Sequence, residues 1–252
     1  MTINAPVPEQ IPQLRRLWQQ AFGDTDAFLD SFFGLAFSVE RCRCVYEDGQ
    51  IAAALYWFDC YCDKQKIAYL YAVATDEAYQ NRGLCRALMA DTHSHLAALG
   101  YDSAMLVPGS EDLFALYEKL GYRIATTVGA FTCSAGATPA AVRQIGAQEY
   151  ASLRRKLLPP GGVIQEGAAL SLLETQSALY AGENFLLVAM QNEDELVCSE
   201  LLGPTEAAPG ILAAFGAASG SFRIPDGTIP FAMHLPLQKE AAPPAYFGLA
   251  LD

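Results

Sequence analysis

The stretch Tyr69-Leu-Tyr-Ala-Val-Ala-Thr-Asp-Glu-Ala-Tyr-Gln-Asn-Arg-Gly-Leu-Cys-Arg-Ala-Leu-Met89 decides the fold of this chain. Residues 66–75 are apolar almost throughout, which predicts a strand in the centre of a sheet. The residues that follow predict a long helix over 84–99, and Gly100 is suited to end it. A strand therefore runs through a short glycine-containing turn into a helix.

This turn has the chemistry of an anion site. A helix that follows a strand presents free backbone N–H groups at its positive end. Gly83 lets a bulky diphosphate approach the backbone, and Arg82 and Arg86 can add charge-assisted contacts. An ordinary strand-to-helix turn has a similar pattern, so the turn alone leaves a phosphate site and a purely structural role both open.

The flanking sequence predicts a mixed sheet covered by helices. Asp48-Gly49 lies between two strand-like runs, 42–46 and 51–61, which is a strong hairpin signal. Mixed antiparallel and parallel pairing is typical of an α/β protein. The further elements expected are amphipathic helices within 14–33, capped at Asp24 or Thr25, a strand over 103–107, a helix over 111–120 and a strand over 122–128.

A composition change at Gly136-Ala-Thr-Pro139 predicts a linker between two domains, 1–135 and 139–252. The element order of the second half broadly repeats that of the first. No repeat of residues is visible, so a duplicated fold is a hypothesis. The second half is expected to contain strands at 141–145, 184–190, 195–202, 221–224, 231–237 and 246–251, and helices at 147–158, 167–180 and 211–215.

Two segments resemble the signatures of one superfamily. Gln80-Asn-Arg-Gly-Leu-Cys85 resembles the Q/R-x-x-G-x-G/A loop of GNAT acetyltransferases, and Leu116-Tyr-Glu-Lys-Leu-Gly-Tyr122 resembles their Y-E-K-x-G-F signature. The resemblance covers about 11–131 and implies that backbone amides hold the pyrophosphate of acetyl-coenzyme A while its pantetheine arm pairs like a strand. Cys85 departs from the family's Gly or Ala but is small enough to fit. The implied cofactor contacts are Val73, Ala74, Thr75, Gln80, Asn81, Arg82, Gly83, Leu84, Cys85 and Arg86.

The whole chain is similar to the tandem acetyltransferases related to the enhanced intracellular survival protein, in which a GNAT domain precedes a degenerate one. This resemblance implies that residues 1–135 bind acetyl-coenzyme A and carry the catalysis. Residues 139–252 would then be a degenerate GNAT-like domain that shapes the acceptor site. The second half lacks the phosphate loop, because Gly203-Pro-Thr-Glu-Ala-Ala-Pro-Gly210 contains no basic residue. We expect no diphosphate to bind there.

The expected reaction is transfer of an acetyl group from acetyl-coenzyme A to a primary amine by direct attack. Three alternatives stay open: a non-catalytic sensor of acyl-coenzyme A, an aminoacyl transferase with tandem GNAT-like domains, and acyl transfer through Cys85. The intact loop over 80–85 favours coenzyme A over a tRNA donor. The acceptor could be an aminoglycoside, a polyamine, an amino sugar or a peptide.

Two residues are expected to be catalytic on the strength of the resemblance. Tyr117 occupies the position of the family's tyrosine acid, and a phenol with an unperturbed pKa of about 10 can protonate the departing thiolate. Phe114, Tyr117 and Leu120 share one helical face, so packing is the alternative role. A terminal carboxylate can act as base in the resembling family; here it would be Asp252, with a frayed chain end as the alternative.

No metal site is expected. With an Asp48-Gly49 turn, Cys44 would lie opposite Ala53 and Cys42 opposite Leu55. Cys60 would then lie about 16 Å further along the strand at ~3.3 Å per residue, too far to share a zinc ion.

The three histidines give no metal pair either. His93 and His95 would project about 200° apart on the predicted helix. His234 lies in an apolar strand whose alternation does not set its face.

The composition indicates a compact protein without nucleic acid or membrane as partner. The chain is 52% hydrophobic and carries a net charge of −12, which repels phosphate backbones and anionic lipid. It has no apolar run of about 18 residues and no leader pattern at its start. Seven cysteines suit a reducing compartment, so we expect a cytoplasmic protein. The sequence does not reveal its oligomeric state.

Overall fold

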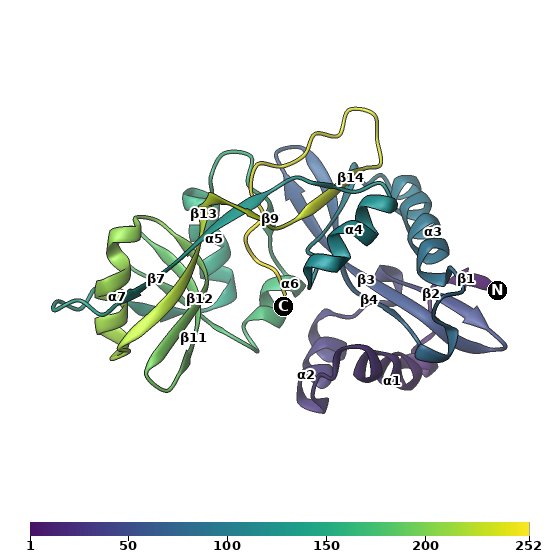
Figure 1. Cartoon of the computed structure of the whole chain (residues 1–252), viewed down its shortest axis with the longest axis horizontal. Helices are drawn as coiled ribbons and strands as arrows, with labels where there is room; N and C mark the ends of the chain where they lie inside the picture. Colours follow the sequence, from purple (N-terminus) through teal and green to yellow (C-terminus); the bar gives the residue numbers. More distant parts are fainter. Residues whose placement is uncertain (252) are drawn as a thin grey trace. The chain divides into compact units, whose positions relative to one another are not determined.

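The computed structural model describes residues 1–251, which form two compact units. The first unit comprises Met1–Arg123 and Met233–Pro243, and the second comprises Ile124–Ala232 and 244–251. Each unit is a sheet with helices packed against it (Figure 1). Both sheets mix antiparallel and parallel strands, which confirms the predicted α/β class.

The first sheet has the strand order β1-β2-β3-β4-β5-β14-β6, in which β6 (Arg123–Ile124) is a two-residue strand at the edge. From β1 to β14 the pairs are antiparallel except for β4 and β5, which run parallel and are joined through α3. The elements are β1 (Thr2–Asn4), η1 (Pro8–Gln10), α1 (Ile11–Phe22), α2 (Asp26–Ser31), a π-helical turn η2 (Phe32–Ala36), η3 (Val39–Arg41), β2 (Cys42–Glu47), β3 (Gln50–Cys62), β4 (Gln65–Thr75), η4 (Glu77–Tyr79), α3 (Leu84–Ala98), β5 (Ser103–Leu106), α4 (Glu111–Lys119) and β14 (Met233–Pro236).

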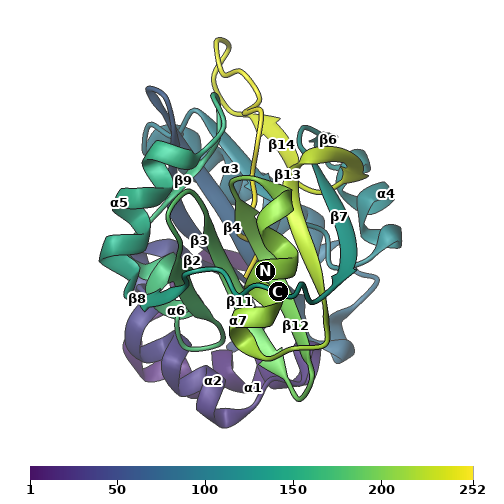
Figure 2. The same cartoon turned by 90° about the vertical axis from the view of Figure 1, so that its left-hand side faces the viewer.

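The second sheet has the strand order β8-β10-β11-β12-β13-β7. It is likewise antiparallel except for one pair, β12 and β13, which α7 joins (Figure 2). The elements of this part of the chain are β7 (Thr127–Ser134), β8 (Arg143–Ile145), α5 (Ala147–Leu157), β9 (Ile164–Gln165), α6 (Ala168–Leu173), β10 (Ala178–Ala181), β11 (Leu186–Asn192), β12 (Glu195–Leu202), η5 (Thr205–Ala207), α7 (Ala208–Phe215) and β13 (Ser219–Pro230). The short β9 is not one of the six strands of this sheet.

The two sheets thus share one plan: three antiparallel pairs, a helical crossover to a parallel strand, and then an antiparallel strand. This agreement supports the duplicated fold that the element order suggested. In each sheet the strand next to the parallel pair, β14 in the first and β7 in the second, comes from the other half of the sequence. The yellow β14 lies among the early elements of the first unit, whereas the teal β7 lies among the later elements of the second (Figure 1).

This exchange of strands moves the division away from the predicted boundary at 135/139. Gly136-Ala-Thr-Pro139 lies inside the second unit, where Gly136 N–H donates to the Pro209 carbonyl at 2.8 Å. The strand expected over 122–128 is two strands, β6 and β7, that belong to different sheets. Pairing between strands that are distant in the sequence does not change the local pattern of residues. The composition change at 136–139 therefore does not mark the division between the two units.

The hairpin forms as predicted, but its register differs. Glu47 pairs with Gln50, yet Cys44 lies opposite Ala54 instead of Ala53, because a bulge between Val45 and Tyr46 shifts the ladder by one residue. By the same shift Cys42 lies opposite Tyr56 instead of Leu55.

Two other predicted elements are wrong. The helix expected over 167–180 ends at Leu173, and Ala178–Ala181 is strand β10. No strand forms over 246–251, where Tyr246 makes only an isolated bridge to Gly162. Both stretches are buried and apolar, a pattern that does not separate helix, strand and irregular backbone.

The first sheet has two distinct faces. Its α3 face packs Leu55, Trp57 and Leu70 against Leu84 and Leu88 of α3. Its α1 face, reached by alternation along β3 and β4, carries Tyr56 and Tyr71, whose rings lie 5.2 and 5.6 Å from that of Trp18. Thr25 caps α2 by accepting from the Phe28 N–H at 3.2 Å.

Candidate functional site

Strands β4 and β5 separate partway along the sheet. Their parallel ladder runs from Ile67–Ser103 to Tyr69–Met105 and stops there, while β4 continues to Thr75. Ala72 adopts a left-handed φ of 50° at a register shift against β3. A bulge of this kind bends a strand, and it lies just beyond the last β4–β5 pair.

The outer part of β4 consequently has backbone groups on one side that pair with no neighbouring strand. Asp76 N–H donates to the Ala52 carbonyl at 2.9 Å. This bond shows which residues of β4 direct their backbone groups toward β3. By alternation, Ala74 directs its N–H and C=O toward β3, and Val73 and Thr75 direct theirs away from it. The edge of β4 beside the gap can therefore pair with an extended ligand.

The turn after β4 is held by its own hydrogen bonds. Asp76 accepts from the Ala78 N–H at 2.9 Å, and Gln80 Nε2 donates to the Thr75 carbonyl at 3.4 Å. Asn81 and Gly83 both adopt left-handed backbone, with φ of 60° and 75°. These conformations turn the chain sharply from the strand into α3.

Helix α3 begins with unpaired amides. Its first hydrogen bond runs from the Ala87 N–H to the carbonyl of the N-cap Gly83, at 3.1 Å. The N–H groups of Leu84, Cys85 and Arg86 precede it and point out of the helix end. A Cβ atom added to Gly83 would meet no atom within 4 Å, so the space beside this glycine is open.

The predicted basic residues lie at the rim of the turn. Arg82 is exposed, donates to the Ala78 carbonyl at 2.8 Å and lies over the Tyr79 ring at 5.1 Å. Arg86 is exposed on the first turn of α3, while Leu84 is buried in the core and Cys85 is half-buried. The structure thus brings the predicted loop residues 80–86 together around the positive end of α3.

Tyr117 on α4 is almost buried, with 8% of its surface exposed. Its ring lies edge-on to that of Tyr122, at 5.9 Å between centroids. Burial, and secondarily the Cys85 thiol nearby, raises the pKa of the Tyr117 phenol. Within residues 1–251 the Tyr117 hydroxyl has no hydrogen-bond partner. Asp252, the other predicted catalytic residue, lies outside the described residues.

Sequence reasoning missed a buried pair behind Tyr117. Tyr122 is fully buried and its hydroxyl lies 2.7 Å from Nε2 of His93 on α3. Burial lowers the pKa of His93 to about 4, so this imidazole is neutral at pH 7. A tyrosine in place of the signature's Phe was the sequence signal for this contact.

Among residues 1–251 no cluster of three or more His, Cys, Asp or Glu side chains has the geometry to hold a metal ion. The Sγ atoms of Cys42 and Cys44 are 3.8 Å apart and fully buried.

The second unit differs at the equivalent place. Gly203 follows β12 as the turn follows β4, but a Cβ there would lie 2.6 Å from the Asn184 carbonyl oxygen. The room beside this glycine is therefore filled by the protein itself. Beyond it, the short helix α7 starts with Pro209 in its first turn.

A buried ion pair occupies the end of β12. Glu200 accepts two hydrogen bonds from Arg154, both at 2.8 Å, one from Tyr150 at 2.8 Å and one from Tyr246 at 2.9 Å. Burial alone raises the pKa of the Glu200 carboxyl, but Arg154 and these hydrogen bonds outweigh it and hold that pKa below its ordinary value.

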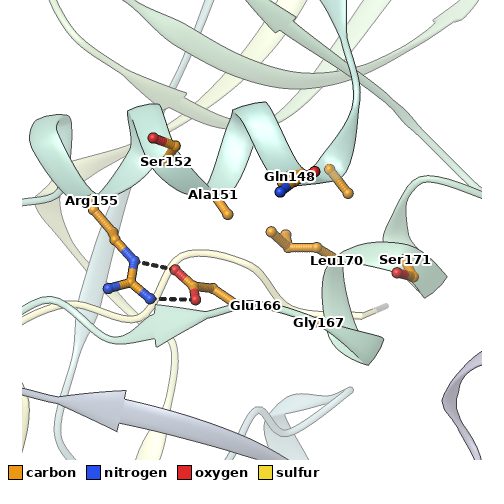
Figure 3. A pocket seen from close by; sticks show the side chains of 9 residues that line it. Gln148, Ala151, Ser152, Arg155, Glu166, Gly167, Leu170 and Ser171 are labelled. Atoms are coloured by element: carbon orange, nitrogen blue, oxygen red, sulfur yellow. Dashed lines mark hydrogen bonds and ion pairs between the residues drawn. The ribbon is translucent and has the colours of Figure 1, made fainter.

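The second unit also carries a shallow pocket of about 460 Å³ between α5 and α6 (Figure 3). Arg155 and Glu166 form an ion pair at its margin, and Leu170 and Ala151 supply apolar wall. Glu166 and Gly167, which connect β9 to α6, line it as well, but α6 has only six residues and no basic side chain in its first turn.

The turn and the helix that follows it lie in a region that matches a known protein family. Residues 3–125 match the family model described as the acetyltransferase (GNAT) domain. A stretch of 78 residues, 30% of the chain, is 36% identical to the mycothiol acetyltransferase of Mycobacteroides abscessus and spans about a quarter (26%) of that relative's length.

Solved structures match nearly the whole chain. A GCN5-related N-acetyltransferase from Kribbella flavida gives a TM-score of 0.70 at 17% identity, over 92% of this chain and 70% of that one. Eis1 from Mycobacterium abscessus gives 0.72 at 11% identity, over 95% and 75%. At such identities the likeness shows a common fold.

No helix of the described residues is long and apolar enough to cross a membrane.

Proposed function

Because residues 3–125 belong to the acetyltransferase (GNAT) domain family and the chain is an acyltransferase of that fold, we propose that it transfers an acetyl group from acetyl-coenzyme A to a primary amine. The observation that carries this proposal is the junction of β4 and α3. It combines a free strand edge, two left-handed turn residues and an open space beside Gly83.

The diphosphate of the cofactor would bind at the start of α3. The N–H groups from Asn81 to Arg86 converge on the positive end of the helix, which stabilises an anion there. Gln80, through its bond to Thr75, holds the turn against β4. Arg82 and Arg86 at the rim would add charge-assisted contacts.

The pantetheine arm would extend along β4. The backbone groups of Val73 and Thr75 face away from β3 and would pair with the arm's amides, whereas those of Ala74 face β3. Such strand-like pairing would direct the thioester toward the last β4–β5 pair, Tyr69–Met105.

Tyr117 would protonate the departing thiolate. As the amine attacks, the carbon–sulfur bond breaks and negative charge collects on sulfur, which a nearby O–H stabilises. The raised pKa of Tyr117 keeps this phenol protonated throughout the neutral range. Its hydroxyl, which has no partner within residues 1–251, is available for the task. The half-buried Cys85 beside it has a pKa raised by burial, which favours packing over acyl transfer.

The second unit is proposed to contribute to acceptor binding without holding a nucleotide. The turn at Gly203 is filled by Asn184 and Phe185, and 203–210 has no basic side chain. The acceptor is proposed to be a small molecule or peptide with a primary amine, and an acidic protein favours such cations.

Two assays test the proposal. Coenzyme A at a hundred times its Kd should stabilise the fold by about 2.7 kcal/mol, which a thermal unfolding scan detects. Release of free thiol from acetyl-coenzyme A should then require an amine, tested with glucosamine, spermidine, tyramine and an alanyl peptide. No thermal shift at millimolar coenzyme A would refute the binding site. A shift without amine-dependent thiol release would favour the non-catalytic sensor.

A further inference from the structure

Two polar side chains on β5 and β14 of the first sheet are buried without a hydrogen-bond partner among residues 1–251. They are Nε2 of His234 on β14 and Oγ of Ser103 on β5. His234 keeps 5% of its surface exposed and Ser103 none. Buried polar groups are almost always paired, so an unpaired one points to a ligand or an ordered water.

Both side chains lie on the α1 face. Ala104, Leu106, Met233 and Leu235 belong to or pack against the core on the α3 face. Side chains alternate along a strand, so the residues between them project from the opposite face. His234 and Ser103 therefore share the face that also carries Tyr69.

The strand register puts His234 level with the gap between β4 and β5. Met105 pairs with Tyr69 on one side and with His234 on the other, so the three form one row across the sheet. This row is the last before β4 and β5 separate. Ser103 pairs with Pro236, which makes it the diagonal neighbour of His234 on that face, about 7–8 Å away.

We propose that His234 is the base that takes a proton from the acceptor amine, with Ser103 binding the same ammonium group or the water that links it to the imidazole. The proposal rests on the acetyl transfer proposed above, which would bring the thioester to the end of this row. A group that abstracts a proton needs to reach it directly or through one water.

The chemistry balances with the groups named. A primary amine is an ammonium ion at neutral pH and has no lone pair for attack. The lone pair of Nε2 accepts one proton, and the freed nitrogen lone pair forms the carbon–nitrogen bond as the carbon–sulfur bond breaks. Tyr117 gives its proton to sulfur, and the phenolate then takes the second of the three ammonium protons from the newly acylated nitrogen. The third proton stays as the N–H of the amide, and the imidazolium proton passes to solvent.

The surroundings keep this imidazole neutral. Burial lowers the pKa of His234 below its ordinary value, so it is unprotonated at pH 7. The other titratable side chains of the first unit on the α1 face of the neighbouring strands are Tyr69 and Tyr71 on β4 and Tyr56, Cys60 and Cys62 on β3. None of them is a carboxyl or an amino group. On β5 and β14 this face carries Ser103, Met105, His234 and Pro236.

The test uses His234→Gln, with His95→Gln on the outer part of α3 as matched control. For each amine that the wild type acetylates, we expect kcat of His234→Gln to fall about 10² to 10⁴-fold with the Kd for coenzyme A unchanged. The wild-type rate should also fall as the pH drops through the His234 pKa, which burial holds below its ordinary value, and this acid limb should vanish in the variant. His95→Gln should match the wild type in both respects.

A second measurement does not depend on any variant's folding. The chain has three histidines, so their ring signals can be assigned by NMR and each pKa measured in the wild type. Agreement between the His234 pKa and the acid limb of kcat/KM supports the proposal. A mismatch, or a His234→Gln variant within about threefold of the wild type, overturns it and leaves a buried water at this site. A wild type that binds coenzyme A but acetylates no amine overturns the proposed function itself.

Discussion

The two units follow one strand plan but treat the turn after their central strand in opposite ways. In the first, Gly83 is left-handed and borders open space at the start of a 15-residue helix. In the second, Gly203 is packed against Asn184 and Phe185, and an eight-residue helix follows. The open turn of the first unit leaves room for the proposed anion site, whereas the filled turn of the second is part of a closed core.

The units also differ in how they use buried polar groups. The first leaves Ser103 Oγ and His234 Nε2 buried without partners within residues 1–251. The second satisfies Glu200 completely with Arg154 and two tyrosines. Unpaired groups cost stability and persist where chemistry needs them, so this contrast supports catalysis in the first unit and a structural role for the ion pair of the second.

The largest expected effect is the loss of catalysis when the Tyr117 hydroxyl of the first unit is removed. Tyr117→Phe should lower kcat about 10² to 10⁴-fold, because only the proton is removed, while Tm and the Kd for coenzyme A stay near wild type. Tyr180→Phe in the second unit is the control and should leave kcat unchanged. Steady-state kinetics with the amine that the wild type acetylates fastest measures kcat of each variant. A Tyr117→Phe variant within a few-fold of the wild type would make Tyr117 a packing residue.

The ion pair of the second unit should matter for stability instead. Glu200→Gln leaves Arg154 buried without its partner charge, which costs about 3–5 kcal/mol. Chemical denaturation measures this loss, and kcat per folded molecule should change little. If the variant were as stable as the wild type, the ion pair would not anchor the second unit.

The same pair predicts a pH dependence of stability. The folded-state pKa of Glu200 is below its ordinary value, so the stabilisation is fully present above about pH 4.3, the unfolded value, and is lost as the pH falls through the folded one. Glu200→Gln should remove this contribution. Denaturation midpoints measured between pH 3 and 7 for both proteins would reveal it as a smaller slope in the variant.

The smallest expected effect is that of Arg86, the exposed arginine beside the turn, on the Kd for coenzyme A. Arg86→Gln should raise the Kd for coenzyme A only a few-fold, because Arg86 is exposed and solvent screens its charge. The difference from wild type should shrink as salt is raised from 0.05 to about 0.5 M. A loss of binding as large as that from a change at Gly83 would mean that charge, and not backbone geometry, dominates the site.

Much of the first unit could be predicted from its sequence, because its signals are local. The Asp48-Gly49 turn, the apolar run of β4 and the glycine before α3 each act within a few residues. The bulge between Val45 and Tyr46 and the exchange of β7 and β14 could not, since they depend on pairing with distant segments. For the same reason His234 could be assigned to a face only once its partner Met105 was known.

The central claim is that the first unit, and only the first, binds acetyl-coenzyme A, through the turn at Gly83. Gly83 and Gly100 flank α3, both are left-handed and both border open space, so replacing either by Ala should cost a similar 1–2 kcal/mol of backbone strain. Isothermal titration with coenzyme A separates them. We predict one molecule bound per chain, affinity retained in Gly100→Ala and lost by at least tenfold in Gly83→Ala. Two molecules per chain, or equal affinity in the two variants, would contradict the account.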